Sequence, residues 1–293
     1  MGPVLAAFLV GAPAHAETVR TSRLAMGTVV GIAVVTDDPA GAAPAIEAGW
    51  AAIEAGEAEL SEWRPGSATS RLAAGRVAAG GAIRMSGAAD RLFTFVGELR
   101  DQTGGAFDIS WRAPAPTPVL SRADDGWSLS SPGPVDLGGV LKGWLVDRAA
   151  EALRAGGLRD FMVDAAGDIY AAGDAEGGRG WLVDVEGARR GDKPVGLATV
   201  RLRDAALSTS GNAGQPGHIH DAVSGRALTG ERVVSVVAPS AMVADGLATA
   251  LYASGWREGL AERHDAVAVD HGEAPRWSRG ARRVFLPPRA RGW

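Results

Sequence analysis

The segment VDLGGVLKG at residues 135–143, which continues as WLVDRAA at residues 144–150, is the most informative stretch of the chain. It places a carboxylate (Asp136), two glycines and a lysine (Lys142) at the predicted start of a helix. Glycines let a ligand approach the backbone, a helix N-terminus favours anions, and a lysine adds a compact positive charge. The segment therefore suits the phosphates of a nucleotide. Two glycines before a helix also occur as an ordinary connection, and that alternative stays open.

Strands and helices are expected to alternate around this segment. Apolar and polar residues alternate from Arg20 to Thr36, as in a strand or a hairpin that contains Met26-Gly27-Thr28. Helices are expected from about Pro39 to Ser61, from Ser86 to Thr103, from the glycine-lysine segment to about Arg154, and from Ala241 to Ser254. Further strands are expected at 161–165, 168–172, 181–185, 199–203, 233–238, 266–269 and 283–286. This order predicts an α+β (mixed α/β) fold without internal repeats.

Composition limits the class of protein. The chain has 293 residues, enough for one large or two small domains, and 46% of them are hydrophobic, enough for a buried core. A net charge of -4 lacks the basic footprint that nucleic acids require, so no nucleic-acid partner is expected. The chain contains no cysteine, so any metal must be held by oxygen or imidazole.

The N-terminal residues are predicted to be an export signal. An apolar run from Val4 to Val10 is followed by Ala14-His15-Ala16, in which small residues flank a larger one. We therefore expect a signal peptide at residues 1–16, a domain at residues 17–293 and a periplasmic location. No Lys or Arg precedes the apolar run, and a buried N-terminal strand or helix is the alternative. No later stretch approaches the roughly 20 consecutive apolar residues that span a bilayer.

Asp245 and Thr249 are candidate metal ligands. They lie four residues apart on the helix predicted after Ser240, so their oxygens share one face. Mg²⁺ could use both, since it takes oxygen ligands and usually only one or two carboxylates. The alternative is a solvated aspartate and a threonine bonded to its own helix. The apolar neighbours of Asp245 favour burial, and a buried carboxylate needs a partner.

Three other segments carry polar groups that could form a site. Residues 164–168 (DAAGD) and 207–212 (LSTSGN) offer glycines and polar backbone, and either could instead be a tight turn. His218 and His220 would share one face if their segment is a strand. With Asp221 they could form a metal site, or a general base with its orienting partner, or a surface strand without chemistry.

In sequence order, these motifs resemble the signature blocks of the ApbE family, the FAD:protein FMN transferases. The matching blocks are MGT at 26–28, WRPGS at 63–67, FDIS at 107–110, DLGG and KG within 136–143, AAGDI at 165–169, TSG at 209–211, the segment 218–225, and Ala244-Asp245 with Thr249. The resemblance covers the chain from Met26 to about Leu251. It implies a single ApbE-like, T-fold-related domain with mixed sheets and packed helices.

The resemblance also implies an exported, Mg²⁺-dependent enzyme. Members of the family cleave the pyrophosphate of FAD, transfer FMN to a threonine hydroxyl of an acceptor flavoprotein, and release AMP. FAD is then a substrate, and the partner carries an exported, threonine-containing flavinylation motif. By position, FAD contacts would come from Met26, Trp63, Ala106, Phe107, Asp108, Asp136 and Lys142, and the metal would be held by the Gly139 carbonyl, Asp245 and Thr249.

The chain departs from the family pattern at several positions. His220 stands where the family usually has an apolar flavin-site residue, so we include it among the flavin contacts with its role open. The run DAVSGRA at residues 221–227 lacks both prolines of the family motif, which should loosen this loop. Ala166 replaces a usual glycine. Ala248 stands where some relatives have a further carboxylate, which argues for one metal.

His218, with Asp221 nearby, is the candidate general base, because a threonine hydroxyl is a weak nucleophile near neutral pH. Two alternatives to the transferase remain. Water in place of threonine would give an FAD pyrophosphatase that yields FMN and AMP. A non-catalytic periplasmic flavin-binding protein would result if the changes at residues 221–227 disable turnover.

Overall fold

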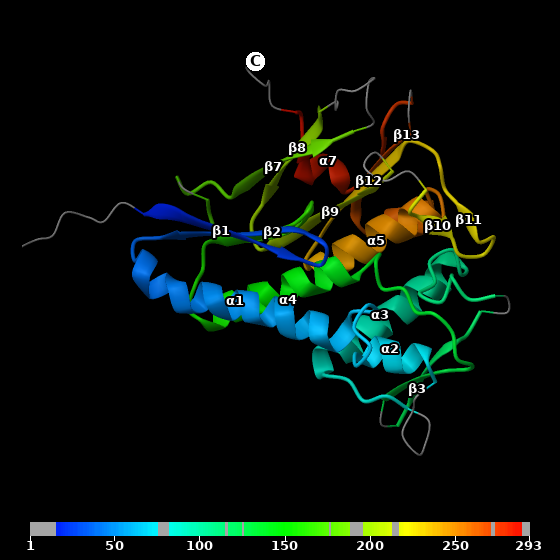
Figure 1. The fold of residues 1–293 in the computed structure, drawn as a ribbon. Helices are drawn as coiled ribbons and strands as arrows, with labels where there is room; N and C mark the ends of the chain where they lie inside the picture. Colours follow the sequence, from blue (N-terminus) through cyan, green and yellow to red (C-terminus); the bar gives the residue numbers. More distant parts are fainter. Residues whose placement is uncertain are drawn as a thin grey trace, which may run out of the picture.

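A large antiparallel sheet organises the fold (Figure 1). The structure is a computed structural model, which describes residues 16–75, 82–114, 117–124, 126–175, 177–187, 196–212, 217–270 and 273–288. All but the last residue of the expected signal peptide lie outside these ranges, so the signal peptide stays a prediction. Among the described residues, no helix combines the length and the apolar character needed to cross a bilayer.

Eight described strands form the large sheet, and every neighbouring pair in it is antiparallel. Across the sheet they are β1 (Glu17–Ala25), β2 (Thr28–Thr36), β5 (Phe161–Ala165), β6 (Asp168–Ala172), β9 (Ala205–Gly211), β12 (Arg232–Ala238), β13 (Asp265–Asp270) and β14 (Arg276–Trp277). A smaller sheet contains β15 (Phe285–Leu286), β8 (Gly196–Leu202) and β7 (Trp181–Glu186). Two hairpins pair β3 (Leu120–Ala123) with β4 (Gly126–Leu129) and β10 (His220–Asp221) with β11 (Arg226–Ala227).

Several of the described helices begin after a residue whose side chain caps the first turn. They are α1 (Pro39–Leu60), α2 (Ala68–Ala73), α3 (Gly87–Thr103), α4 (Leu141–Ala155), α5 (Ala241–Ala253), α6 (Glu258–Ala261) and α7 (Ala281–Val284). Before α1, the Asp38 carboxylate accepts a hydrogen bond from Gly41 N, and proline occupies the first helical position. Ser86 and Ser240 cap α3 and α5 in the same way.

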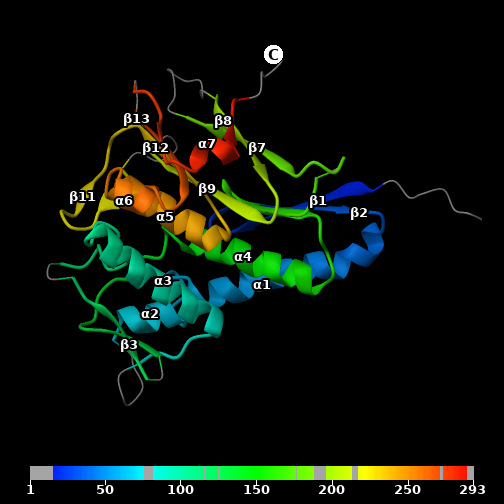
Figure 2. The same cartoon turned by 180° about the vertical axis from the view of Figure 1, so that it is seen from behind.

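The elements form three layers (Figures 1 and 2). Helices α1 and α4 cover one face of the large sheet, where Val30, Ile32 and Val34 of β2 pack in one buried cluster with Trp50 and Ile53 of α1. The smaller sheet and α7 cover the other face, and α3 packs beside α5 at the end of the molecule that holds the site. As a result, the β5–β6 turn, at one end of the large sheet, lies close to the start of α4.

Two tight hairpin turns lie at this end of the sheet. Met26 and Gly27 join β1 to β2 with φ of 54° and 69°, and Ala166 and Gly167 join β5 to β6 with φ of 55° and 96°. Two-residue hairpin turns of type I′ require positive φ at both positions, which glycine adopts without strain and other residues adopt at a cost. Segment 164–168 is therefore a tight turn, as one of its two interpretations predicted.

The predicted fold class is confirmed, since helices and strands form one mixed α/β domain. The segment 207–212 is not a turn, because its residues up to Gly211 form strand β9 between β6 and β12. The strand predicted at 283–286 is wrong in its first half, where Arg283 and Val284 end α7. Only Phe285 and Leu286 pair with β8, in the smaller sheet, because Phe285 is the buried residue of the segment.

Candidate functional site

Two adjacent cavities open where the sheet end, α4 and α5 meet. The first has a volume of about 470 Å³ and lies among the start of α4, α5, β9 and the segments 106–112 and 218–222. The second has a volume of about 450 Å³ and lies among the β1–β2 turn, the end of α1 and the loop after it. Both are lined by Asp136, Gly138 and Lys142, so the glycine-lysine segment forms the wall that the two cavities share.

Lys142 brings a partly buried positive charge to this junction. Its Nζ donates to the carboxylate of Asp168, which is buried at the start of β6 and also accepts from the hydroxyl of Ser208. Burial alone would lower the pKa of Lys142, but the carboxylates of Asp245 and Asp168 outweigh that effect and raise the pKa above its usual value. The lysine is therefore charged, and its side chain, 35% exposed, can reach a ligand in either cavity.

Asp245 presents a buried carboxylate from α5. The residue is 3% exposed, and its Oδ2 accepts a hydrogen bond from Gly143 N at 3.0 Å. Burial and, second to it, the nearby Asp168 carboxylate raise the pKa of Asp245 to about 7, against the opposite effects of Lys142 and the bond from Gly143. A buried carboxylate with such a pKa is expensive to keep ionised, which marks Asp245 as a candidate functional group.

Oxygen donors gather beside Asp245. Thr249 lies one turn further along α5, and its Oγ1 is 3.1 Å from Oγ of Ser210 on β9. The Gly139 backbone approaches closely, since a Cβ built at Gly139 would lie 3.3 Å from Oγ1 of Thr249. A carboxylate, a hydroxyl and a backbone carbonyl are hard ligands that fit Mg²⁺.

The described residues contain no group of three or more His, Cys, Asp and Glu side chains arranged for a metal. An ion beside Asp245 would therefore rely on one carboxylate, neutral oxygens, water and the phosphates of a ligand. Mg²⁺ is commonly held in this way, through one or two carboxylates plus substrate phosphates. The donor set fits one magnesium ion held in this way.

Asp136 is held by its neighbours at the junction. Its carboxylate accepts hydrogen bonds from Trp111 Nε1 at 2.9 Å and from Gly138 N at 2.8 Å, and it pairs with Arg112 at 2.9 Å. Arg112 also pairs with Glu62 in the second cavity at 3.1 Å. Burial, and then the charge of Asp136, raise the pKa of Glu62. This network ties the loop before α4 to the walls of both cavities.

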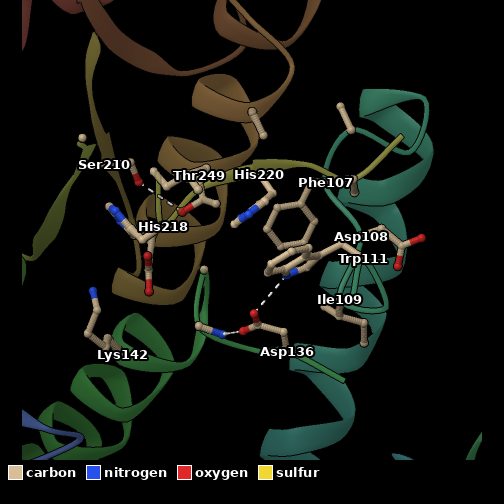
Figure 3. A pocket seen from close by; sticks show the side chains of 18 of the residues that line it. Phe107, Asp108, Ile109, Trp111, Asp136, Lys142, Ser210, His218, His220 and Thr249 are labelled. Atoms are coloured by element: carbon tan, nitrogen blue, oxygen red, sulfur yellow. Dashed lines mark hydrogen bonds between the residues drawn. The ribbon is translucent and has the colours of Figure 1, made fainter. Parts of the chain in front are cut away.

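Aromatic rings line one side of the first cavity (Figure 3). Trp111 stacks on His220 with ring centroids 4.0 Å apart and an interplanar angle of 20°. Phe107 lies beside them, whereas Lys142, His218 and Ser210 lie on the other side of the view. Nδ1 of His220 is buried and has no hydrogen-bond partner in the described part of the chain. The cavity thus has an aromatic side and a charged side.

The carboxylate of Asp108 is hydrogen-bonded within the wall of this cavity. Its carboxylate accepts hydrogen bonds from Arg100 Nε and from Ser110 N, each at 2.8 Å. In Figure 3 it points away from Thr249. Nearby, Ala106 O accepts a hydrogen bond from Ala222 N at 3.2 Å, which joins this segment to the loop after β10. The carboxylate of Asp108 therefore shapes the segment 106–110, and a ligand would meet its backbone and ring atoms.

The second cavity is bordered by Met26 and Trp63. Met26 donates its backbone N–H to Glu57 of α1 at 2.9 Å, which holds the β1–β2 turn over the end of the helix. Trp63 is 80% exposed, an unusual state for a large aromatic side chain. A planar ligand group could cover it.

His218 and Asp221 do not occupy equivalent places. His218 lines the first cavity, whereas Asp221 does not. The Asp221 carboxylate accepts hydrogen bonds from Val223 N at 3.0 Å and from Ser224 Oγ at 2.7 Å, so both its oxygens are used within its own turn. The pairing of Asp221 with His218 stays a prediction that these contacts do not support. Only His220 and Asp221 of this segment are in a strand, so the histidines do not alternate along one.

Every other predicted site residue lines one of the two cavities. Those in the first cavity are Ala106, Phe107, Asp108, Asp136, Gly139, Lys142, His218, His220, Asp245 and Thr249, and those in the second include Met26 and Trp63. Sequence reasoning missed Trp111, Arg112, Asp168 and Ser210 as lining residues. Asp168 and Ser210 lie in segments that the sequence singled out for their polar glycine turns, but nothing distinguished Trp111 or Arg112.

Fold and site together define a mixed α/β domain with a two-part cavity large enough for a dinucleotide. A sequence model of the ApbE family matches residues 118–269, just over half of the chain. The chain therefore belongs to the ApbE family.

Curated relatives agree with this family assignment. The FAD:protein FMN transferase of Vibrio cholerae serotype O1 is 36% identical over 137 residues, which cover 43% of this chain and 40% of that protein. The FAD:protein FMN transferase of Treponema pallidum is 32% identical over 154 residues, which cover 46% of this chain and 42% of that protein. The chain thus matches about two fifths of the length of these curated relatives.

Solved structures show the same fold over a longer stretch. The flavin transferase ApbE from Vibrio cholerae superposes with a TM-score of 0.78 at 23% identity, over 92% of this chain and 99% of that chain. The apo form of the flavinyl transferase ApbE from Pseudomonas stutzeri gives a TM-score of 0.78 at 22% identity, over 92% and 97%. At these identities the likeness establishes the fold.

Proposed function

We propose that this protein transfers the FMN half of FAD to a threonine hydroxyl of an acceptor flavoprotein and releases AMP. The observation that carries the proposal is the junction of two cavities at Lys142, beside the oxygen donors of α5. FAD has a ring system at each end and a pyrophosphate between them. Each cavity would take one ring system, and the junction would take the pyrophosphate. The relatives named FAD:protein FMN transferase support the same reaction.

The start of α4 supplies positive potential for the pyrophosphate. Val140, the residue before the helix, provides no side-chain cap, and Lys142 stands in the first turn. Helix N-termini attract anions, and a charged lysine adds to that attraction. The Lys142 pairing with Asp168 keeps the ammonium oriented until a phosphate approaches.

Gly139, Asp245 and Thr249 would hold one Mg²⁺ through oxygen atoms. When bound, the ion would neutralise negative charge on the pyrophosphate oxygens as the leaving AMP gains charge. Asp245 is suited to this role because its buried carboxylate has few other partners to neutralise it. Lys142 would remain beside the phosphates as a fixed charge.

The transfer forms one bond and breaks one. The threonine oxygen bonds to the phosphorus of the FMN half, the bond from this phosphorus to the bridging oxygen breaks, and AMP leaves with the electron pair. The hydroxyl proton needs an acceptor, and His218 on the wall of the first cavity is our candidate. Asp221 is our candidate for the residue that orients His218. Its support is weaker than that of His218, because both Asp221 carboxylate oxygens accept hydrogen bonds within their own turn.

The proposal includes the compartment and the partner. A periplasmic location and an acceptor with an exported, threonine-containing flavinylation motif follow from the family resemblance. An FMN transferase requires a protein acceptor that can reach the bound FAD. The acceptor would approach the first cavity, where His218 and the donors of α5 lie.

The test is product analysis with FAD, Mg²⁺ and an acceptor domain that carries the motif. We expect AMP by chromatography and a covalently flavin-labelled acceptor by in-gel fluorescence and mass spectrometry. The matched control is the acceptor with its threonine replaced by alanine, which should remain unlabelled. Free FMN with AMP and no labelled acceptor would instead show a pyrophosphatase, and recovery of intact FAD would show a binding protein without turnover.

A further inference from the structure

A carboxylate of α4 holds the first turn of α5, the helix that carries Asp245 and Thr249. Oδ1 of Asp147 accepts a hydrogen bond from Ala241 N at 2.7 Å, and Oδ2 accepts one from Met242 N at 2.9 Å. Each oxygen therefore bonds a different backbone N–H of the same helical turn. Such a two-point attachment restrains both the position and the rotation of α5 relative to α4.

The two helices are also in direct backbone contact. Gly143, one turn before Asp147, donates its N–H to Asp245 at 3.0 Å. A Cβ built at Gly143 would lie 2.8 Å from Cβ of Asp245 and well inside van der Waals contact with the carbonyl oxygen of Ala241. With so little space between the helices, the bonds from Asp147 and Gly143 fix one register of α5 along α4.

The carboxylate of Asp147 is not needed as an ordinary helix cap. Ser240 already caps α5, since its Oγ accepts a hydrogen bond from Val243 N at 3.3 Å. Burial raises the pKa of Asp147 to about 6, against the lowering effect of its bonds from Met242 and Ala241. A second, partly desolvated cap thus costs stability, which suggests that it serves the site.

The ligand set needs the register that Asp147 maintains. Gly139 precedes α4, whereas Asp245 and Thr249 belong to α5, and a Cβ at Gly139 would lie 2.8 Å from Cγ2 of Thr249. Mg²⁺ requires near-ideal octahedral geometry with short bonds, so a small shift of α5 would separate the donors. We propose that Asp147 is a positioning residue that sets the α4–α5 register and thereby brings these three donors to one divalent ion. The proposal rests on the metal-dependent function proposed above.

Direct metal binding tests the proposal without catalysis. Binding of Mn²⁺, a paramagnetic substitute for Mg²⁺, would be titrated by electron paramagnetic resonance on the full chain. We expect Asp147→Ala to weaken Mn²⁺ binding about tenfold, the scale on which groups that orient metal ligands act. Ser86→Ala is the matched control, because it removes the side-chain cap of α3 and leaves Asp147 and its bonds to α5 in place. It should lower Tm and leave the Kd for Mn²⁺ within about twofold.

Asp147→Asn keeps the fold testable if the alanine variant does not fold. Its amide has one acceptor oxygen, so one of the two bonds survives, and Mn²⁺ binding should be intermediate. Unchanged Mn²⁺ affinity in any folded Asp147 variant would overturn the proposal, as would a wild-type chain that binds no Mn²⁺. Suppose that the wild type binds Mn²⁺ tightly, that the Asp147 variants do not, and that the wild type transfers no FMN. This result would refute the proposed function and leave the positioning role of Asp147 supported.

Discussion

Replacing Asp245 with asparagine should stabilise the metal-free protein while removing the metal site. Burial raises the pKa of Asp245 from 3.8 to about 7. Below pH 3.8 the group is protonated in the folded and unfolded states alike, and its contribution to stability is lost as the pH rises towards 7. At about 1.4 kcal/mol per pKa unit, ionisation in the folded protein costs roughly 4 kcal/mol above pH 7.

The net gain should be smaller than this cost. The asparagine oxygen can still accept the hydrogen bond from Gly143 N, but Lys142 loses one of its carboxylate neighbours. We therefore expect Asp245→Asn to gain about 2 kcal/mol at pH 7.5, which raises Tm by roughly 4–8 °C in a domain of this size. Mg²⁺ should raise the Tm of the wild type by mass action and leave that of the variant unchanged.

The assay is thermal unfolding followed by circular dichroism at pH 7.5, in EDTA and in excess Mg²⁺. Asp168→Asn is the matched control, because it makes the same change in a buried carboxylate beside the same lysine. It should lower Tm in EDTA, since it removes the ion pair with Lys142 while its amide oxygen can still accept from the Ser208 hydroxyl. An Asp245→Asn variant that melts below the wild type in EDTA, or that Mg²⁺ stabilises as much as the wild type, would refute the reasoning.

Four further predictions each concern a single residue. Gly139→Ala should raise the Mg²⁺ concentration for half-maximal turnover at least tenfold, because its Cβ would lie 2.8 Å from Cγ2 of Thr249. Ala166→Gly should raise Tm in EDTA by a few degrees, since Ala166 has φ of 55° and relief of a left-handed residue gains about 1 kcal/mol. For Asp147→Asn, urea unfolding should show that the free energy of unfolding relative to the wild type increases by up to roughly 3 kcal/mol as the pH rises from about 4 to 6.5. Only the wild type carries a carboxylate whose raised pKa makes the folded protein lose stability over this pH range. Trp63→Ala should weaken FAD binding in fluorescence titrations about tenfold without lowering Tm, because the ring is 80% exposed and a bound ring system would stack on it.

Local patterns predicted the helices that build the site. Capping residues and apolar spacing placed α1, α3 and α5 within a residue or two of their observed limits. Strand β9 was harder, because the sequence LSTSG reads as a turn when its neighbours are unknown. Its polar residues Ser208 and Thr209 are paired across the sheet and with Asp168 and Ser235, and these contacts are non-local. At this strand, pairing with the neighbouring strands overrides the local turn propensity of the sequence.

The site itself required information beyond local pattern. Gly143 and Asp245 share a hydrogen bond although 102 residues separate them, and Trp111 stacks on a histidine from another part of the chain. Nothing in a periodic pattern brings such residues together, and only the family resemblance grouped Lys142 with α5. Asp221 shows the opposite case, since its bonds to Val223 and Ser224 are local turn chemistry that its sequence could have predicted.

The central claim is that one FAD molecule occupies both cavities with its pyrophosphate at Lys142 and a single ion beside it. A crystal structure of the complex with FAD and Mn²⁺, with anomalous scattering data, tests this most directly. The account predicts one ring system in each cavity and one anomalous peak within bonding distance of Asp245 and Thr249. Phosphates bound away from Lys142, or an ion located elsewhere, would contradict it.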